Sequence, residues 1–238
     1  MGDELSEGVR LLWGPHPKPS RGPKPGLSLE RIARAGVEIA DAEGLAAVSM
    51  QRVAGQLDFT KMSLYRYVPG KAELVALMVE TAIGEVPPPG APTGGWREQL
   101  GAWAGQLAAV FHRHPWLLDA TVGPRLVGPA ELSWMEQAAA ALDGTGLTGA
   151  ECLDALVLLA GHVRGIAQQS RAAGSAAKPE AEFAAVLGTV VQAHGERYPA
   201  LTAAFASAAS LGGQDQALDF GLRRILDGLG VLITQRAG

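Results

Sequence analysis

The chain of 238 residues has little cysteine, few aromatic residues and no long apolar run. Its single cysteine, Cys152, excludes an internal disulfide and is typical of a protein from a reducing compartment. Because no uninterrupted run approaches about eighteen apolar residues, we expect no membrane span and no membrane partner. Hydrophobic residues still make up 47% of the chain and charged residues 18%, which predicts a folded protein.

The sequence also lacks the usual signatures of enzymes and metal sites. It contains no glycine-rich phosphate loop, no zinc-ligand spacing and no nucleophile elbow. His112 and His114 are two positions apart, which separates them by about 200° on a helix and disfavours a shared metal. We therefore expect no catalytic residue, no metal and no cofactor.

The N-terminal segment 1–27 starts with an acidic stretch and continues with the proline-rich sequence WGPHPKPSRGPKPG. It has no apolar segment followed by a cleavage site, so we expect the protein to stay in the cytoplasm. Such a segment cannot pack a core, and we predict a flexible basic arm. Arg21 and Lys24 are placed to reach phosphates or a minor groove, although a plain flexible tail is the alternative.

Charge is divided unevenly along the chain. Residues 18–71 contain nine Lys or Arg against five Asp or Glu, whereas residues 84–238 contain ten against fourteen. Only the first region therefore has the positive balance that nucleic-acid binding favours.

The segment 49–71, SMQRVAGQLDFTKMSLYRYVPGK, predicts two short helices around a tight turn. Ser49 is the expected cap of the first helix, which extends to about Gln56, and Thr60 is the expected cap of the second. Leu64 and Val68, four residues apart, are expected to point inward. The remaining polar and aromatic side chains form a predicted DNA-binding surface, in which the second helix reads bases and flanking groups hold phosphates. The predicted DNA-binding residues are Arg21, Lys24, Ser49, Gln51, Arg52, Thr60, Lys61, Met62, Ser63, Tyr65, Arg66, Tyr67 and Lys71.

With the helices before and after it, this segment resembles the N-terminal domain of the TetR family of bacterial transcriptional repressors. The resemblance covers residues 27–79 and depends on the first helix ending at Gly44, the VAGQL helix, the SLYRYV run and the KAEL start of helix four. Asp58 is a departure, because the family usually has glycine at this turn position. Asp tolerates a left-handed backbone at some cost.

The resemblance implies an all-α protein. A three-helix helix-turn-helix domain would be joined by helix four to a larger C-terminal helical domain that binds a ligand and dimerises. We predict a DNA-binding domain over 28–84, a linker over 85–95 and the C-terminal domain over 96–238. Within the latter we expect helices over 96–113, 116–126, 129–142, 148–173 and 215–234, with one or two more before the last.

Two C-terminal helices have broader apolar stripes than one chain needs. The resemblance implies that the helices expected over 148–173 and 215–234 form a four-helix bundle with the same helices of a second copy. The alternative is burial within one chain. The predicted homodimer contacts are Leu156, Leu159, Leu218, Leu222, Ile225 and Leu229.

The few aromatic residues of the helices expected over 96–113, 116–126 and 129–142, with nearby polar groups, suggest a pocket for a small hydrophobic effector. Simple core packing is the alternative for each of them. The candidate pocket residues are Trp103, Phe111, His112, Trp116, Thr121, Arg125, Trp134 and His162. The tetracycline-responsive members use a histidine early in helix six, and LLDATVGPRL has none, so tetracycline is not the expected effector.

The expected function is that of a regulator that binds a palindromic DNA operator and is released from it by a small molecule. One alternative is a constitutive DNA-binding regulator without an effector. Another is an enzyme or a small-molecule-binding protein built on the C-terminal helical domain.

Overall fold

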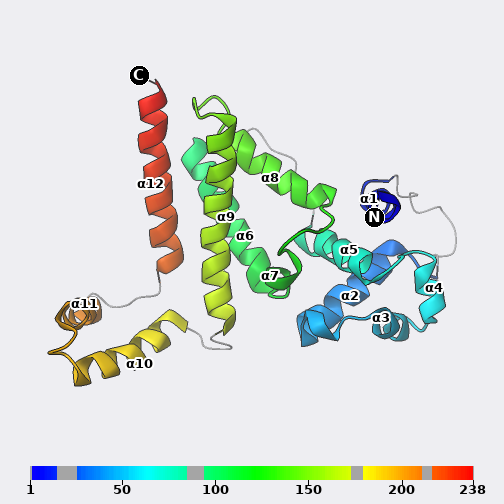
Figure 1. Cartoon of the computed structure of the whole chain (residues 1–238), viewed down its shortest axis with the longest axis horizontal. Helices are drawn as coiled ribbons and strands as arrows, with labels where there is room; N and C mark the ends of the chain where they lie inside the picture. The colour runs from blue at the N-terminus through cyan, green and yellow to red at the C-terminus, as the bar shows by residue number, and fades with distance from the viewer. Residues whose placement is uncertain (1, 15–25, 85–93, 173–178, 211–215, 238) are drawn as a thin grey trace. The chain divides into compact units, whose positions relative to one another are not determined.

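The computed structural model describes residues 2–14, 26–84, 94–172, 179–210 and 216–237. Within these ranges every regular element is a helix (Figure 1), which confirms the predicted all-α class. The chain divides into two compact units, Met1–Leu156 and Val157–Gly238. The predicted linker 85–95 lies outside the described residues except for Gly94 and Gly95.

The first unit contains the helix-turn-helix segment, and its helices start where capping side chains occur. Ser28 accepts a hydrogen bond from the amide of Arg31 at 3.3 Å, and Ser49 accepts one from Arg52 at 3.2 Å. Each such cap typically contributes about 1 kcal/mol. The elements are α2 (Leu29–Glu43), the 3-10 turn η1 (Leu45–Ala47), α3 (Met50–Gln56), α4 (Lys61–Tyr65) and α5 (Lys71–Ile83).

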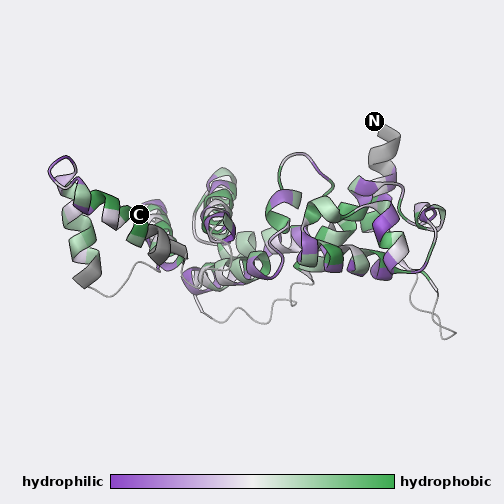
Figure 2. Cartoon of the chain, turned by 90° about the horizontal axis from the view of Figure 1, so that it is seen from below, coloured by the Kyte–Doolittle hydropathy of each residue, from purple (hydrophilic) through white to green (hydrophobic). Residues whose placement is uncertain are grey.

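These helices enclose a small apolar core, and α5 contributes several of its buried side chains. Leu74 and Met78 on α5 are fully buried, as is Ile32 on α2. Gly36 lets α2 approach α5 closely, because a Cβ at this position would lie 2.7 Å from the sulfur of Met78. Figure 2 shows apolar and polar residues alternating around these helices, as amphipathic packing requires.

The turn between α3 and α4 has a left-handed residue at Asp58, whose φ is 60°. Its position allows the amide of Phe59 to reach back to the carbonyl of Ala54 at 2.9 Å, which closes the end of α3. Asp58 therefore keeps the geometry that glycine usually provides at this turn, since Asp is among the few residues that adopt a left-handed conformation.

The α1 helix (Gly2–Trp13) corrects the prediction of a flexible arm over the whole of 1–27. Leu12 is buried, α1 contacts α5, and the indole N–H of Trp13 donates to the carbonyl of Val127 at 3.0 Å. Arg10 in its last turn suits the helix dipole. The prolines that motivated the prediction come later. Arg21 and Lys24 lie outside the described residues.

The rest of the first unit contains α6 (Trp96–Arg113), α7 (Leu117–Ala120), α8 (Pro129–Ala141) and the start of α9 (Gly149–Ala172). The predicted helix over 116–126 is wrong in its second half. Gly123 has a φ of 74°, which is not helical, and Pro124 after it disfavours a helical conformation at the preceding residue. The segment 121–128 is therefore irregular and leads into α8.

The second unit consists of the remainder of α9 with α10 (Pro179–Ala193), α11 (Pro199–Ser210) and α12 (Ala217–Ala237). Within it, α9 and α12 are joined by His162, whose Nε2 lies 3.0 Å from the carbonyl oxygen of Leu218. Gly221 makes room for that imidazole. Among the described residues, no helix is long and apolar enough to cross a membrane.

The Asp58 turn generates a stability prediction. Asp58→Val places a β-branched side chain at positive φ and should lower the free energy of unfolding by about 1–2 kcal/mol. Asp58→Gly removes the steric restriction and should stay within about 1 kcal/mol of the original chain. Thermal unfolding of both variants would check this, and equal losses would contradict the left-handed turn.

Candidate DNA-binding surface and effector region

The α4 helix separates a buried face from an exposed one. Leu64 and the nearby Val68 have no exposed surface, whereas the Met62 side chain is 72% exposed. Lys61, Tyr65, Arg66 and Tyr67 are also exposed. This division leaves the start of α4 open to a partner, as a helix that reads the major groove requires.

Polar contacts organise the exposed start of α4. The hydroxyl of Thr60 accepts from the amide of Ser63 at 3.3 Å, and the two hydroxyl oxygens are 2.9 Å apart. The ammonium of Lys61 lies 5.4 Å from the centre of the Tyr65 ring, within the range of a cation–π interaction. Lys61 and Tyr65 therefore lie beside each other on the exposed face of α4.

The α3 side of the surface has two contacts that sequence reasoning missed. Arg52 forms an ion pair with Glu43, and the side-chain amide of Gln56 donates to Glu38 at 2.7 Å. The Arg52 charge is thus partly balanced, which reduces its attraction for phosphate. Because the partners are nine and eighteen residues apart, no helical spacing indicates these pairs.

Most predicted DNA-binding residues are brought together by the packing of α3 against α4. Ser49, Gln51 and Arg52 are exposed at the start of α3, and Lys71 is exposed at the start of α5. Arg21 and Lys24 remain outside the described residues.

The candidate effector region has a tryptophan pair at its centre. The indole N–H of Trp103 on α6 donates to the backbone carbonyl of Trp134 on α8 at 2.9 Å, and the ring centres are 6.2 Å apart. Both side chains are buried, as is Phe111. Trp103 and Trp134 therefore belong to the packed contact between α6 and α8.

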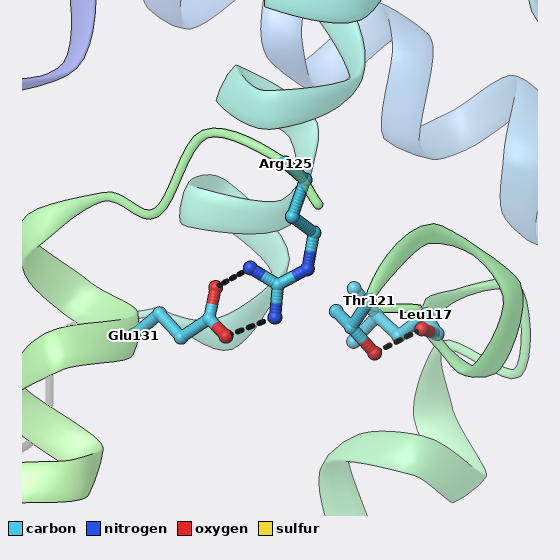
Figure 3. A network of polar contacts seen from close by, with 4 residues as sticks. All are labelled: Leu117, Thr121, Arg125 and Glu131. Carbon is cyan, nitrogen blue, oxygen red and sulfur yellow. Dashed lines mark hydrogen bonds and ion pairs between the residues drawn. The ribbon is translucent and has the colours of Figure 1, made fainter. Parts of the chain in front are cut away.

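The irregular segment between α7 and α8 contains Arg125, whose guanidinium makes two hydrogen bonds to the carboxylate of Glu131. Figure 3 shows this guanidinium between Glu131 and Thr121, whose hydroxyl donates to the carbonyl of Leu117 at 2.6 Å. Arg125 is therefore fixed in orientation by an acidic residue on α8.

Three buried polar atoms of this region have no hydrogen-bond partner among the described residues. They are Nε of Arg125, Nε1 of Trp134 and Oε1 of Gln137. Gln137 was not among the predicted residues. Its position one helical turn after Trp134 is the only signal that the sequence offers.

The other predicted pocket residues lie elsewhere. His112 is exposed, because one residue after Phe111 is about 100° further around α6. Trp116 is 2% exposed, and its indole N–H donates to Asp41 of α2 at 2.7 Å. His162 belongs to the second unit, where it contacts Leu218.

The cap of α4 generates a second prediction. Thr60→Ala removes the acceptor for the Ser63 amide and should lower the free energy of unfolding by about 1 kcal/mol, whereas Thr60→Ser keeps an acceptor and should change it little. Chemical denaturation would measure both values. A loss that is as large for Thr60→Ser would show that the methyl group, and not the cap, matters.

Comparison with known proteins gives consistent matches along the chain. Residues 28–78 match the family described as "Bacterial regulatory proteins, tetR family", and residues 88–233 match "Tetracyclin repressor-like, C-terminal domain". The chain is 40% identical to the HTH-type transcriptional repressor DrrR1 of Streptomyces coeruleorubidus, over 99% of this chain and 89% of that protein.

Two solved structures from Streptomyces coelicolor have a similar fold. Apo ActR has a TM-score of 0.76 at 25% identity and covers 90% of this chain and 99% of its own. ActR in complex with actinorhodin has a TM-score of 0.70 at 27% identity, and the match covers 85% of this chain and 95% of the ActR chain.

Proposed function

Because the chain belongs to the tetR family of bacterial regulatory proteins, we propose that it is a cytoplasmic repressor that binds a palindromic operator as a homodimer and leaves it when a small molecule binds. The observation that carries this proposal is the two-faced α4. Leu64 is fully buried in the DNA-binding head, which is the segment from α2 to α5, and Lys61 and Tyr65 are exposed. The relative DrrR1 is named a transcriptional repressor, which supports repression over activation as the role of this chain.

We assign base reading to the start of α4 and phosphate binding to the residues around it. Lys61 is placed to donate to acceptors at base edges in the major groove. The Tyr65 hydroxyl, Arg66, Tyr67 and Lys71 then hold the backbone and fix the register. One short helix contacts few bases, so two linked half-sites are needed for affinity and specificity.

Single substitutions separate these two roles. Lys61→Ala should relax base preference at one operator position, at a cost of about 1–3 kcal/mol on the preferred base. Tyr65→Phe keeps the ring beneath Lys61 and removes only the hydroxyl, so it should weaken binding to all duplexes alike. Titrations against a series of single-base operator variants at fixed salt would measure both effects.

The experiment that tests the proposal is selection of binding sites from random duplex DNA, because the operator is unidentified. The original chain should enrich a palindrome, and a Lys61→Ala, Tyr65→Ala double variant should not. A matched control is Glu30→Gln, an exposed change on α2, which should enrich the same palindrome. Equal enrichment by the original chain and the double variant would refute the assignment of α4.

The homodimer is supported by apolar residues that the second unit leaves exposed. Val157 is 71% exposed on α9, and Phe220 and Val231 are 61% and 59% exposed on α12. Several predicted contacts of these helices, such as Leu159 and Leu229, are instead buried in the single chain. We therefore place the interface on the neighbouring, exposed faces of the same two helices.

The effector region is supported by the three buried polar atoms without partners. An unsatisfied buried group typically costs about 1–3 kcal/mol, so a ligand that supplies the missing partners would be favoured there. Trp134 and Arg125 offer N–H donors, and Gln137 offers an acceptor. ActR was solved in complex with actinorhodin, and we propose that the effector of this chain is chemically similar to actinorhodin.

Release from DNA then follows as a population shift. The effector would favour a conformation in which the α6–α8 helices open around it and the two recognition helices no longer match the half-site spacing. The largest factor by which the effector can shift the equilibrium between the two conformations is the ratio of its affinities for them.

Trp134→Phe tests the effector region, with actinorhodin as the probe. The variant loses an N–H that has no partner among the described residues, but it also loses buried ring volume, so its own thermal midpoint without the probe is the reference. The increase in the thermal midpoint caused by the probe should shrink. An unchanged increase would exclude the Trp134 N–H as a ligand contact, and no increase in the original chain would refute the proposed ligand class.

A further inference from the structure

One carboxylate of the DNA-binding head receives two hydrogen bonds from outside the head. Asp41, near the end of α2, has its Oδ1 2.8 Å from Nδ1 of His114 and 2.7 Å from Nε1 of Trp116. These partners are 73 and 75 residues further along the chain, at the elbow between α6 and α7. The contact therefore joins α2 to the helices that the effector would occupy.

The position of Asp41 is not explained by the stability of α2. A carboxylate in the last turn of a helix is disfavoured by the helix dipole, and α2 has no basic residue in that turn. The two N–H donors of the elbow offset this cost. Asp41 is thus stabilised by its contact with the elbow and not by its own helix.

The elbow depends on the same contact. The Trp116 side chain is 2% exposed, and its indole N–H can only donate, so it needs an acceptor. The His114 side chain is 12% exposed and lies edge-on to Trp116, with ring centres 6.2 Å apart. Losing Asp41 would leave a buried donor unsatisfied at the junction of α6 and α7.

The elbow also leads directly into the effector region. After Trp116 the chain forms α7 and continues to Arg125 and α8, where the unpartnered polar atoms lie. Rearrangement of that segment around a ligand would move the elbow and with it the two donors. Because both donors bind the Asp41 carboxylate, their movement would displace α2. The α2 helix packs against α3, so the displacement would reach the helix-turn-helix.

We propose that Asp41 is a positioning residue that couples the α6–α7 elbow to the DNA-binding head, through His114 and Trp116. This role rests on the proposed function, in which the elbow responds to the effector. Coupling between two sites is reciprocal, so operator binding at α4 should in turn stabilise α7, which makes no contact with DNA in this arrangement. This reciprocity allows a test that needs no effector.

The test is hydrogen exchange of backbone amides in the full chain, with and without the selected operator duplex. In the original chain the operator should slow exchange in α4 and also in α7, the latter by about fivefold or more, which is the lower range of allosteric coupling. Asp41→Ala and Trp116→Phe should each keep the slowing in α4 and lose that in α7. Glu30→Gln, a carboxylate change elsewhere on α2, should behave like the original chain.

The outcomes are distinguishable. Slowing of α7 that persists in both variants, or its absence in the original chain while α4 is slowed, would overturn the coupling and leave the proposed function intact. Absence of slowing in α4 of the original chain would overturn both. If Asp41→Ala fails to fold, Trp116→Phe, which keeps a buried ring, gives the result alone. Because a purely structural role would leave the α7 response unchanged in any variant that folds, this readout separates the two roles.

Discussion

The packing of α5 is the constraint on which the rest of the first unit depends. This helix contacts α2 in the head and also contacts α1, α7 and α8. Its buried Leu74 and Met78 belong to the head core, and Gly36 allows α2 to lie against it. Because close-packed interiors do not deform continuously, a helix shared by two cores transmits displacement from one to the other.

Polar contacts also link the DNA-binding head to the helices α6 to α8. Glu80 on α5 accepts from the amide of Ala130 at 2.5 Å, at the start of α8, where a carboxylate suits the helix dipole. Asp41 receives donors from the elbow on the other side. Apolar packing thus fixes the approach of the helices, and these two carboxylates fix their register.

Much of the DNA-binding head is predictable because its signals are local. The caps Ser49 and Thr60 and the inward pair Leu64 and Val68 lie within a few residues of the elements that they define, and all are confirmed. The departure at Asp58 was also readable, because turn chemistry is a property of single residues.

The missed features depend on partners that are distant in sequence. The helix α1 gains stability from Trp13, whose partner Val127 is 114 residues away, and the prolines after it dominated the prediction. The Asp41 contacts span more than seventy residues. Periodicity reports which face of a helix is apolar, but it does not report which polar groups meet across a fold.

In the proposed mechanism the helices that follow α5 set the spacing of the two recognition helices in a homodimer. The most direct measurement is the distance between spin labels on the two heads, attached at Glu30→Cys in a Cys152→Ser background. We expect a broad distance distribution in the free protein and a narrow one when the selected operator is bound. A distribution that the operator leaves unchanged, or no intersubunit distance at all, would contradict it.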